Sequence, residues 1–284
     1  MKYTALQPEL FRKNRERFIR KMKPASIALI PSNPELPENG DARLSFKQNT
    51  NVIWLSGVIQ EKTMVLLNPG HIDKAWREVL VILRPDELLE KWDGHKLTRE
   101  EATAISGIQT VIYTDQVDML IQTWMHQAEH VYLDTNENDR LDPTMPRLDL
   151  HFVQRIQQRY PLHKYERAAR LLKELRTIKT ADEIEVLQQA VDITHHAFLR
   201  VCRFLKPGVM EYEVEAEIMH EFIRRRATRP AYGSIIASGD RARTLHYVEN
   251  NAECKNGELI LMDFGAEYGN YNADLTRTVP VNGK

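Results

Sequence analysis

Two carboxylates near the end of the chain have residue types and a spacing that could bind metal. Asp263 follows the apolar run 259–262, and Asp274 lies further along the same segment. Carboxylate oxygens suit divalent cations such as Mn²⁺, Mg²⁺ or Ca²⁺. Two such cations, about 3.5–4 Å apart, can share and activate one water. Acidic residues are also found at strand ends that simply face water, so the spacing alone leaves both interpretations open.

The residues between the two aspartates predict a β-hairpin. Gly269-Asn270 suits a two-residue turn, so paired residue numbers should sum to 539, the sum of 269 and 270. Asp263 then faces Thr276, and Gly265 faces Asp274. Because side chains alternate between the faces of a strand, the aspartates become diagonal neighbours on one face, with their backbone positions about 7–8 Å apart across the hairpin. Two carboxylates at this short distance repel each other unless a cation lies between them or one of them holds a proton.

The hairpin belongs to the second of two expected domains, residues 171–284. A capping box formed by Thr180 and Glu183 predicts the start of a long helix. A second helix is expected over about 212–227, followed by antiparallel strands that include 234–238 and 244–248, which is an α+β order. Apolar residues three and four apart predict the inward face of the long helix. That face comprises Ile184, Leu187, Val191, Thr194, Phe198, Val201 and Leu205.

Residues 1–170 predict a domain of another kind. Short apolar runs near turn-forming residues alternate with helical segments, which is typical of an α/β domain with a mixed sheet. The expected fold class of the whole chain is therefore α/β followed by α+β.

Composition excludes several classes of function. Lys plus Arg is 39 and Asp plus Glu is 40 in 284 residues, so no basic field favours nucleic acid. No apolar run approaches the ~20 residues that span a bilayer, and the N-terminal MKYTALQPEL lacks the apolar core of a secretory signal. Two cysteines cannot form a disulfide framework, which fits a reducing compartment. We therefore expect a cytoplasmic globular protein with neither a nucleic-acid nor a membrane partner.

Motifs in both domains resemble those of one peptidase family. The segment DFGAEYGNYNADLTRTVPVNGK is similar to the metal-site hairpin of the Xaa-Pro aminopeptidases, the proline-specific branch of the pita-bread metallopeptidases. LRTIKTADEIEVLQQA and KPGVMEYEVEAEI resemble the first two helices of that catalytic domain, and SIIASG followed by LHYVEN resembles its substrate-binding strand. FKQNTNVIWLSG and KWDGHK resemble the family's N-terminal domain. The resemblance implies a creatinase-like N-terminal domain followed by the first half of a pita-bread domain.

The resemblance also implies roles for individual residues. Asp263 matches an aspartate that chelates one of two Mn²⁺ (or similar) ions, and Asp274 matches the aspartate that bridges both. His246 matches a catalytic-site histidine that contacts substrate near the scissile bond. Trp92 matches a loop tryptophan that in some oligomeric relatives reaches a neighbouring subunit, so a homo-oligomer is expected. The implied substrate is a peptide with proline in second position, cleaved after its first residue.

The sequence departs from the family pattern in one respect. The family site needs one further histidine and two glutamates from the second half of the domain, and no histidine follows His246. We therefore expect these 284 residues to resemble a fragment and to be inactive on their own.

Two alternative functions within the pita-bread fold stay open, and two other classes of protein are disfavoured. Prolidase, which cleaves Xaa-Pro dipeptides, cannot be separated from the aminopeptidase on these residues. A non-catalytic pita-bread protein that binds peptides is a further alternative. Creatinase-like relatives lack the metal aspartates, whereas Asp263 and Asp274 are present. The kinase-like triplet Asp263-Phe264-Gly265 lacks the glycine-rich and catalytic loops that a kinase requires.

Overall fold

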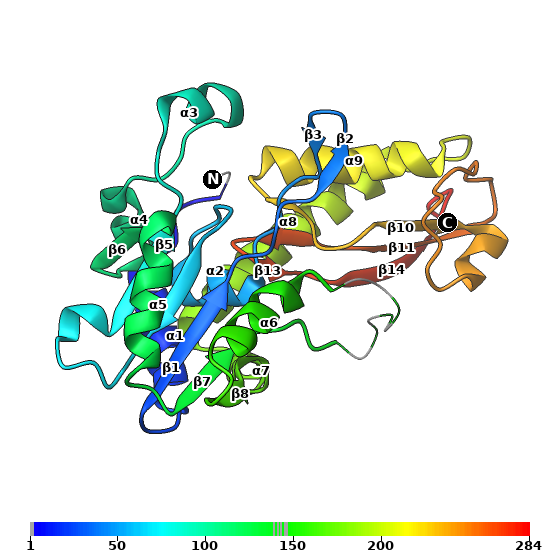
Figure 1. The fold of residues 1–284 in the computed structure, drawn as a ribbon. Coiled ribbons are helices and arrows are strands. Elements are labelled where there is room, and N and C mark those ends of the chain that lie inside the picture. Colours follow the sequence, from blue (N-terminus) through cyan, green and yellow to red (C-terminus); the bar gives the residue numbers. More distant parts are fainter. Residues whose placement is uncertain (1–2, 139, 141, 143, 145–146) are drawn as a thin grey trace. The chain divides into compact units, whose positions relative to one another are not determined.

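The chain forms two compact units in a computed structural model that describes residues 3–138, 140, 142, 144 and 147–284 (Figure 1). One unit consists of residues 6–179, and the other of residues 180–284 together with residues 3–5. The domain boundary expected between residues 170 and 171 stays a prediction.

A six-stranded sheet forms the centre of the unit made of residues 6–179. Its strand order is β6-β5-β4-β1-β7-β8. The pairs β1–β4 and β4–β5 are antiparallel, whereas β1–β7, β7–β8 and β5–β6 are parallel. The expected mixed sheet is therefore confirmed. The strands are β1 (Ser26–Pro31), β4 (Met64–Leu67), β5 (Glu78–Ile82), β6 (Thr110–Tyr113), β7 (His130–Leu133) and β8 (Lys164–Arg167), with a separate hairpin of β2 (Pro37–Asn39) and β3 (Ala42–Arg43).

Helices cover both faces of this sheet because its strands are apolar on both sides. Along β1, Ala28 and Ile30 join one buried cluster, and Ile27 and Leu29 join the other. The first cluster includes residues of α1, α2, α4 and α7, and the second includes residues of α5 and α6. The helices are α1 (Pro8–Ile19), α2 (Thr50–Ser56), α3 (Glu87–Asp93), α4 (Arg99–Ser106), α5 (Val117–Met125), α6 (Asp149–Arg159) and α7 (Ala168–Thr177).

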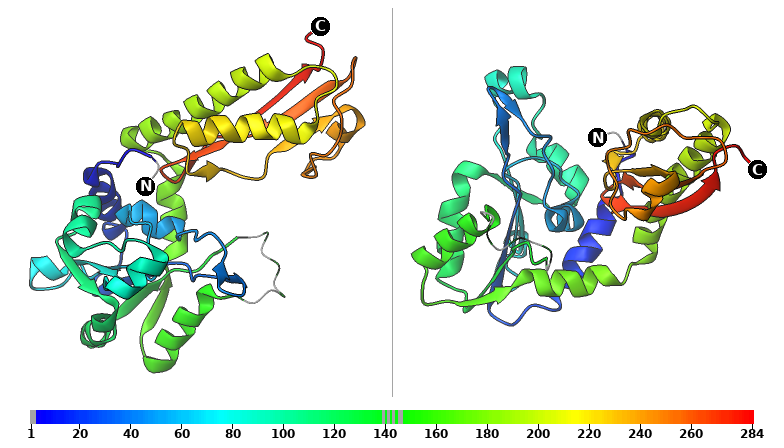
Figure 2. Two further views of the ribbon diagram at one scale, coloured as in Figure 1. Left: turned by 90° about the horizontal axis from the view of Figure 1, so that it is seen from above. Right: turned by 90° about the vertical axis from the view of Figure 1, so that its right-hand side faces the viewer.

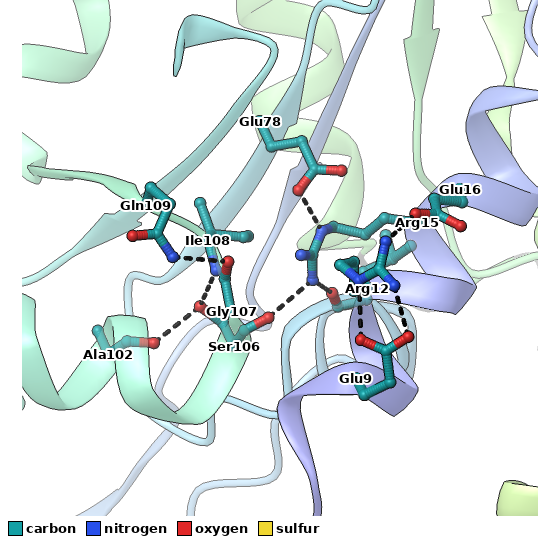
Figure 3. Close-up of polar contacts among 11 residues, drawn as sticks. Glu9, Arg12, Arg15, Glu16, Glu78, Ala102, Ser106, Gly107, Ile108 and Gln109 are labelled. Carbon is teal, nitrogen blue, oxygen red and sulfur yellow. Dashed lines mark hydrogen bonds and ion pairs between the residues drawn. The ribbon is translucent and has the colours of Figure 1, made fainter. Parts of the chain in front are cut away.

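A buried arginine ties several of these elements together (Figure 3). The side chain of Arg15, on α1, is completely buried. It forms an ion pair with Glu78 at 2.8 Å and donates to the carbonyls of Leu55 in α2 and Ser106 in α4. Both carbonyls lie near helix C-termini, where a cation is favourable. Burial lowers the pKa of Arg15, but a guanidinium keeps its charge in proteins.

The second unit begins with two helices. The side chain of Thr180 accepts a hydrogen bond from the backbone N–H of Glu183, and the side chain of Glu183 accepts one from the backbone N–H of Thr180. The helix α8 (Ala181–Phe204) therefore starts at the expected capping box. The second helix, α9 (Glu211–Arg224), buries Val214, Ile218 and Phe222 as the sequence predicts. Figure 2 shows these two helices running alongside the strands of the unit.

The inward face predicted for α8 is wrong in part. Ile184 and Val191 are 54% and 44% exposed. The buried stripe is instead formed by Val186, Ala190, Ile193, Ala197 and Val201, with Thr194 beside it. This helix is apolar on two sides, and spacing cannot choose between them. The side with two alanines packs inward because small side chains allow close approach.

Two small sheets follow the helices. The first has the order β10-β11-β14, and the second has the order β13-β12-β9. Their strands are β9 (Arg229–Pro230), β10 (Ile235–Ser238), β11 (Leu259–Phe264), β12 (Ala266–Tyr268), β13 (Tyr271–Asn272) and β14 (Leu275–Pro280).

The hairpin has the predicted register. Asp263 pairs with Thr276 in the ladder of β11 and β14, and Tyr268 pairs with Tyr271 in that of β12 and β13. Gly269 and Asn270 have φ angles of 56° and 71°, which suits a type I′ turn. The chain passes from one sheet to the other at Gly265.

The strand expected over 244–248 is wrong. This segment is a loop that follows a short 3₁₀ helix, Gly239–Arg243. The backbone N–H of Ile236, on β10, donates to the side chain of Asn250 at 2.9 Å. A side-chain amide thus occupies a donor that a neighbouring strand would use. Among the described residues, no helix has the length and apolar character needed to cross a membrane.

Candidate metal site

One tyrosine hydroxyl joins the two aspartates. The hydroxyl of Tyr232 donates to Oδ1 of Asp263 at 2.5 Å and lies 3.0 Å from Oδ1 of Asp274. The two carboxylate oxygens are therefore no further apart than 5.5 Å, the sum of these distances. The side chains converge, as expected from the register and the alternation of faces.

The sheet positions each of the three residues. Asp263 is half-buried in the central strand β11, where it pairs with Ile235 of β10. Asp274 is exposed and directly precedes β14. Tyr232 lies just upstream of β10. Because β10 and β14 flank β11, the pairing of three strands brings three distant positions to one place.

The site has more acceptors than donors. A hydroxyl donates one hydrogen bond, and ionised carboxylates only accept. When Tyr232 donates to Asp263, the contact with Asp274 has no hydrogen of its own. Within the described ranges, no lysine or arginine forms an ion pair with either carboxylate. A cation would supply the missing positive charge, so this group of oxygen atoms fits a divalent metal ion.

Tyr232 was not among the residues singled out in the sequence. Burial, followed by the hydrogen bonds to Asp263 and Asp274, raises the pKa of its hydroxyl, so the neutral donor form is favoured. Its one signal in the sequence is its place shortly before the apolar run 235–237. The pairing of that run, as β10, with β11 could not be predicted from the sequence.

The other two predicted site residues, His246 and Trp92, are both exposed. His246 has an exposed side chain on the loop that follows the 3₁₀ helix. Trp92 belongs to the other unit, near the end of α3, and is 83% exposed. Within the described part of the chain, no group of three His, Cys, Asp or Glu side chains could hold a metal ion. Among these described residues, Asp263 and Asp274 therefore form a pair of candidate ligands and not a complete cage.

Comparison with known families covers both units. Residues 185–284 match the metallopeptidase family M24, and residues 11–132 match the aminopeptidase P N-terminal domain. The fold is thus that of part of a pita-bread metallopeptidase domain preceded by its N-terminal domain. The chain belongs to the aminopeptidase P family, and the fold expected from the resemblance is confirmed.

Individual relatives agree with this assignment. The chain is 31% identical to the Xaa-Pro aminopeptidase of Haemophilus influenzae over 281 residues, and 30% identical to that of Escherichia coli over 282 residues. Among solved structures, aminopeptidase PepP of Pseudomonas aeruginosa matches with a TM-score of 0.85 at 30% identity and 99% coverage of this chain. Escherichia coli aminopeptidase P with the inhibitor Pro-Leu matches with a TM-score of 0.84 at 29% identity and the same coverage.

The chain is shorter than these relatives. The match to the Haemophilus protein covers 98% of this chain, and the match to the Escherichia protein covers 96% of it. Each match covers only 62% of the relative's own length. It covers 63% and 64% of the two solved chains.

Proposed function

We propose that this chain supplies the N-terminal domain and two metal ligands of an Xaa-Pro aminopeptidase, which removes the N-terminal residue of a peptide when proline follows it. The observation that carries the proposal is the convergence of Asp263 and Asp274 on one hydroxyl, with no cationic side chain among the described residues to neutralise them. Family membership supports the same activity.

In this proposal the two aspartates hold a pair of divalent cations, Mn²⁺ being the ion we favour. Such cations lower the pKa of a shared water and polarise the scissile carbonyl. Asp263, on β11, and Asp274, directly before β14, would hold these cations, and Tyr232 would orient the two carboxylates. The exposed imidazole of His246 contacts the substrate near the scissile bond. A cytoplasmic location and a homo-oligomer, in which Trp92 contacts a neighbouring subunit, are further predictions.

We further propose that these 284 residues alone hold a metal ion weakly and do not turn over substrate. The described residues provide a ligand pair and no third histidine, cysteine or acidic side chain beside it. Two carboxylates leave most coordination positions of a cation to water.

Mn²⁺ titration of the purified chain, followed by electron paramagnetic resonance, tests the ligand assignment. We expect weak binding that Asp263→Asn and Asp274→Asn each abolish. Asp240→Asn is the matched control, because Asp240 is an exposed acidic residue of the same unit that pairs with Arg243. Equal binding by all four proteins would remove the two aspartates from the metal site.

Hydrolysis assays test the activity. The chain with Mn²⁺ should not cleave an Xaa-Pro-Xaa tripeptide, and turnover typical of an aminopeptidase would contradict our proposal. In a longer protein that continues through a complete M24 domain, we expect turnover that Asp274→Ala eliminates. Cleavage of Xaa-Pro dipeptides in preference to tripeptides would favour a prolidase instead.

A further inference from the structure

Glu211 is a fully buried carboxylate that the proposed chemistry does not use. It is the first residue of α9, and its side chain has no exposed surface. Within the described part of the chain, no arginine or lysine forms an ion pair with it. Burying an unpaired charge is costly unless hydrogen bonds replace the lost water. The partners of this carboxylate therefore indicate why it is tolerated.

Four donors surround the carboxylate, two on each oxygen. Oε1 accepts from the backbone N–H and the hydroxyl of Ser238, both at 2.8 Å. Oε2 accepts from the hydroxyl of Tyr247 at 2.7 Å and from the backbone N–H of Ala252 at 2.9 Å. The backbone N–H of Glu211 also donates to the carbonyl of Ala252. The start of a helix favours a negative charge as well.

These donors enclose the segment that carries His246. Ser238 is the last residue of β10, Ala252 lies at the far side of the loop, and Tyr247 directly follows His246. We call residues 239–251 the His246 loop. A single carboxylate thus holds both ends and the middle of this loop.

The His246 loop is anchored inside and exposed at its tip. Tyr247 and Asn250 are buried, whereas the side chains of residues 244–246, 248 and 249 are exposed. Asn250 adds a second anchor, since its amide donates to Glu215 and to the carbonyl of Ser234, each at 2.9 Å. The imidazole of His246 therefore projects from a loop whose backbone is tied down on either side of it.

We propose that Glu211 is a positioning residue that fixes the His246 loop and, through it, the imidazole of His246. The link to catalysis rests on the proposed function, in which His246 contacts substrate. The structural part of the proposal, that Glu211 fixes the His246 loop, is independent of the proposed function.

The geometry of these hydrogen bonds requires a carboxylate at position 211 and does not accommodate a carboxamide. Each oxygen of Glu211 faces one backbone N–H, from Ser238 or from Ala252, and a backbone N–H can only donate. A glutamine in the same place must turn its NH₂ group toward one of these donors, which leaves that donor unsatisfied. Glu211→Gln, although nearly isosteric, therefore breaks the arrangement.

Glu215→Gln provides the matched control on the same helix. Glu215 accepts one hydrogen bond, from the side-chain amide of Asn250, and the carbonyl oxygen of a glutamine accepts it equally well. Both substitutions remove one negative charge from α9 and alter a contact with the His246 loop. Only Glu211→Gln places a donor against a donor.

Hydrogen exchange by mass spectrometry on the 284-residue chain tests the proposal. In Glu211→Gln we expect amide exchange in peptides covering 244–252 to accelerate at least tenfold, with β11 and β14 unchanged. Glu215→Gln should match the parent chain. Unchanged exchange in the loop would overturn the proposal, and so would a uniform acceleration through β11 and β14, which would make Glu211 a general stability residue.

Tyr247→Phe keeps the test decisive if Glu211→Gln does not fold. It removes one of the four donors and retains the buried ring. We expect faster exchange confined to the His246 loop and a broadened imidazole resonance of His246. A loop as protected as in the parent chain would contradict the proposal. These readouts need no metal and no turnover, so they can fail while the Mn²⁺ titration succeeds, or the reverse.

Discussion

The carbonyl oxygen of Ala273 lies 1.8 Å from the point where a side chain on residue 265 would begin. Gly265 is therefore the position at which the two arms of the hairpin approach too closely for any Cβ atom. It stands opposite Asp274 in the register, so this close approach sets the place of one candidate metal ligand.

Gly265→Ala should destabilise the unit made of residues 180–284 by about 3 kcal/mol, because the backbone must move to admit the methyl group. Urea denaturation followed by far-ultraviolet circular dichroism measures the loss. Gly233→Ala is the control, since an added Cβ there meets only Val248 at 4.0 Å, an ordinary contact. Equal stability of the two variants would show that the hairpin arms can separate without cost.

Arg15→Ala should destabilise the unit made of residues 6–179 by about 3–5 kcal/mol, because it leaves Glu78 and two helix-end carbonyls without their partner. Arg12→Ala should hardly change the stability, since Arg12 is exposed and pairs with Glu9 and Glu16 on the same helix. Tryptophan fluorescence in urea reports this unit alone, because all four tryptophans lie within it. A small effect of Arg15→Ala would mean that water replaces the guanidinium.

The two cysteines should differ sharply in reactivity. Cys254 is buried, and burial, followed by the charge of Glu211, raises the pKa of its thiol to about 11. Cys202 is exposed on α8. A disulfide reagent at pH 7.5 should label one thiol quickly and the second only after unfolding, since the thiolate is the reactive form. Cys202→Ser should remove the fast reaction, and Cys254→Ser should preserve it.

The segment around α3 should be most protected at low pH. His95 lies 2.8 Å from Glu101 on α4 and 3.3 Å from Glu90 on α3, and the hydrogen bond to Glu101 is the main cause of its raised pKa. A raised histidine pKa stabilises the fold fully below about 6.5, the unfolded value, and this contribution is lost as the pH rises through the folded value.

Hydrogen exchange of residues 87–96 measures this effect. After correction for intrinsic rates, exchange should be slower at pH 6 than at pH 8.5, and His95→Gln should remove the difference. A difference that persists in His95→Gln would assign the pH dependence to another group.

The register of the hairpin could be predicted because it depends on neighbouring residues. The turn at Gly269 and Asn270 fixes every pair on both arms, and the alternation of side chains then places Asp263 and Asp274 on one side. Tyr232 could not be predicted in the same way, because its contact requires β10 to pair with β11 across a long intervening segment.

The two wrong predictions, the inward face of α8 and the strand over 244–248, also failed because non-local contacts decide these features. The apolar pattern of α8 fits two faces, and Ile184 lies on the face that is not buried. The segment 244–248 has the composition of a strand, but Asn250 takes the hydrogen bond that strand pairing needs. The burial of Glu211 also leaves no mark in the sequence, where an acidic residue in the first turn of a helix is ordinary.

Residues 3–5 pack within the unit made of residues 180–284. The ring of Tyr3 lies 5.7 Å from that of Tyr268, and the backbone N–H of Thr4 donates to the hydroxyl of Tyr268. During synthesis this short segment leaves the ribosome before every other described part of the chain, while Tyr268 follows 264 residues after Thr4. The unit made of residues 6–179 can acquire its core in that interval, so the described residues that are translated first are among the last of them to find their native neighbours.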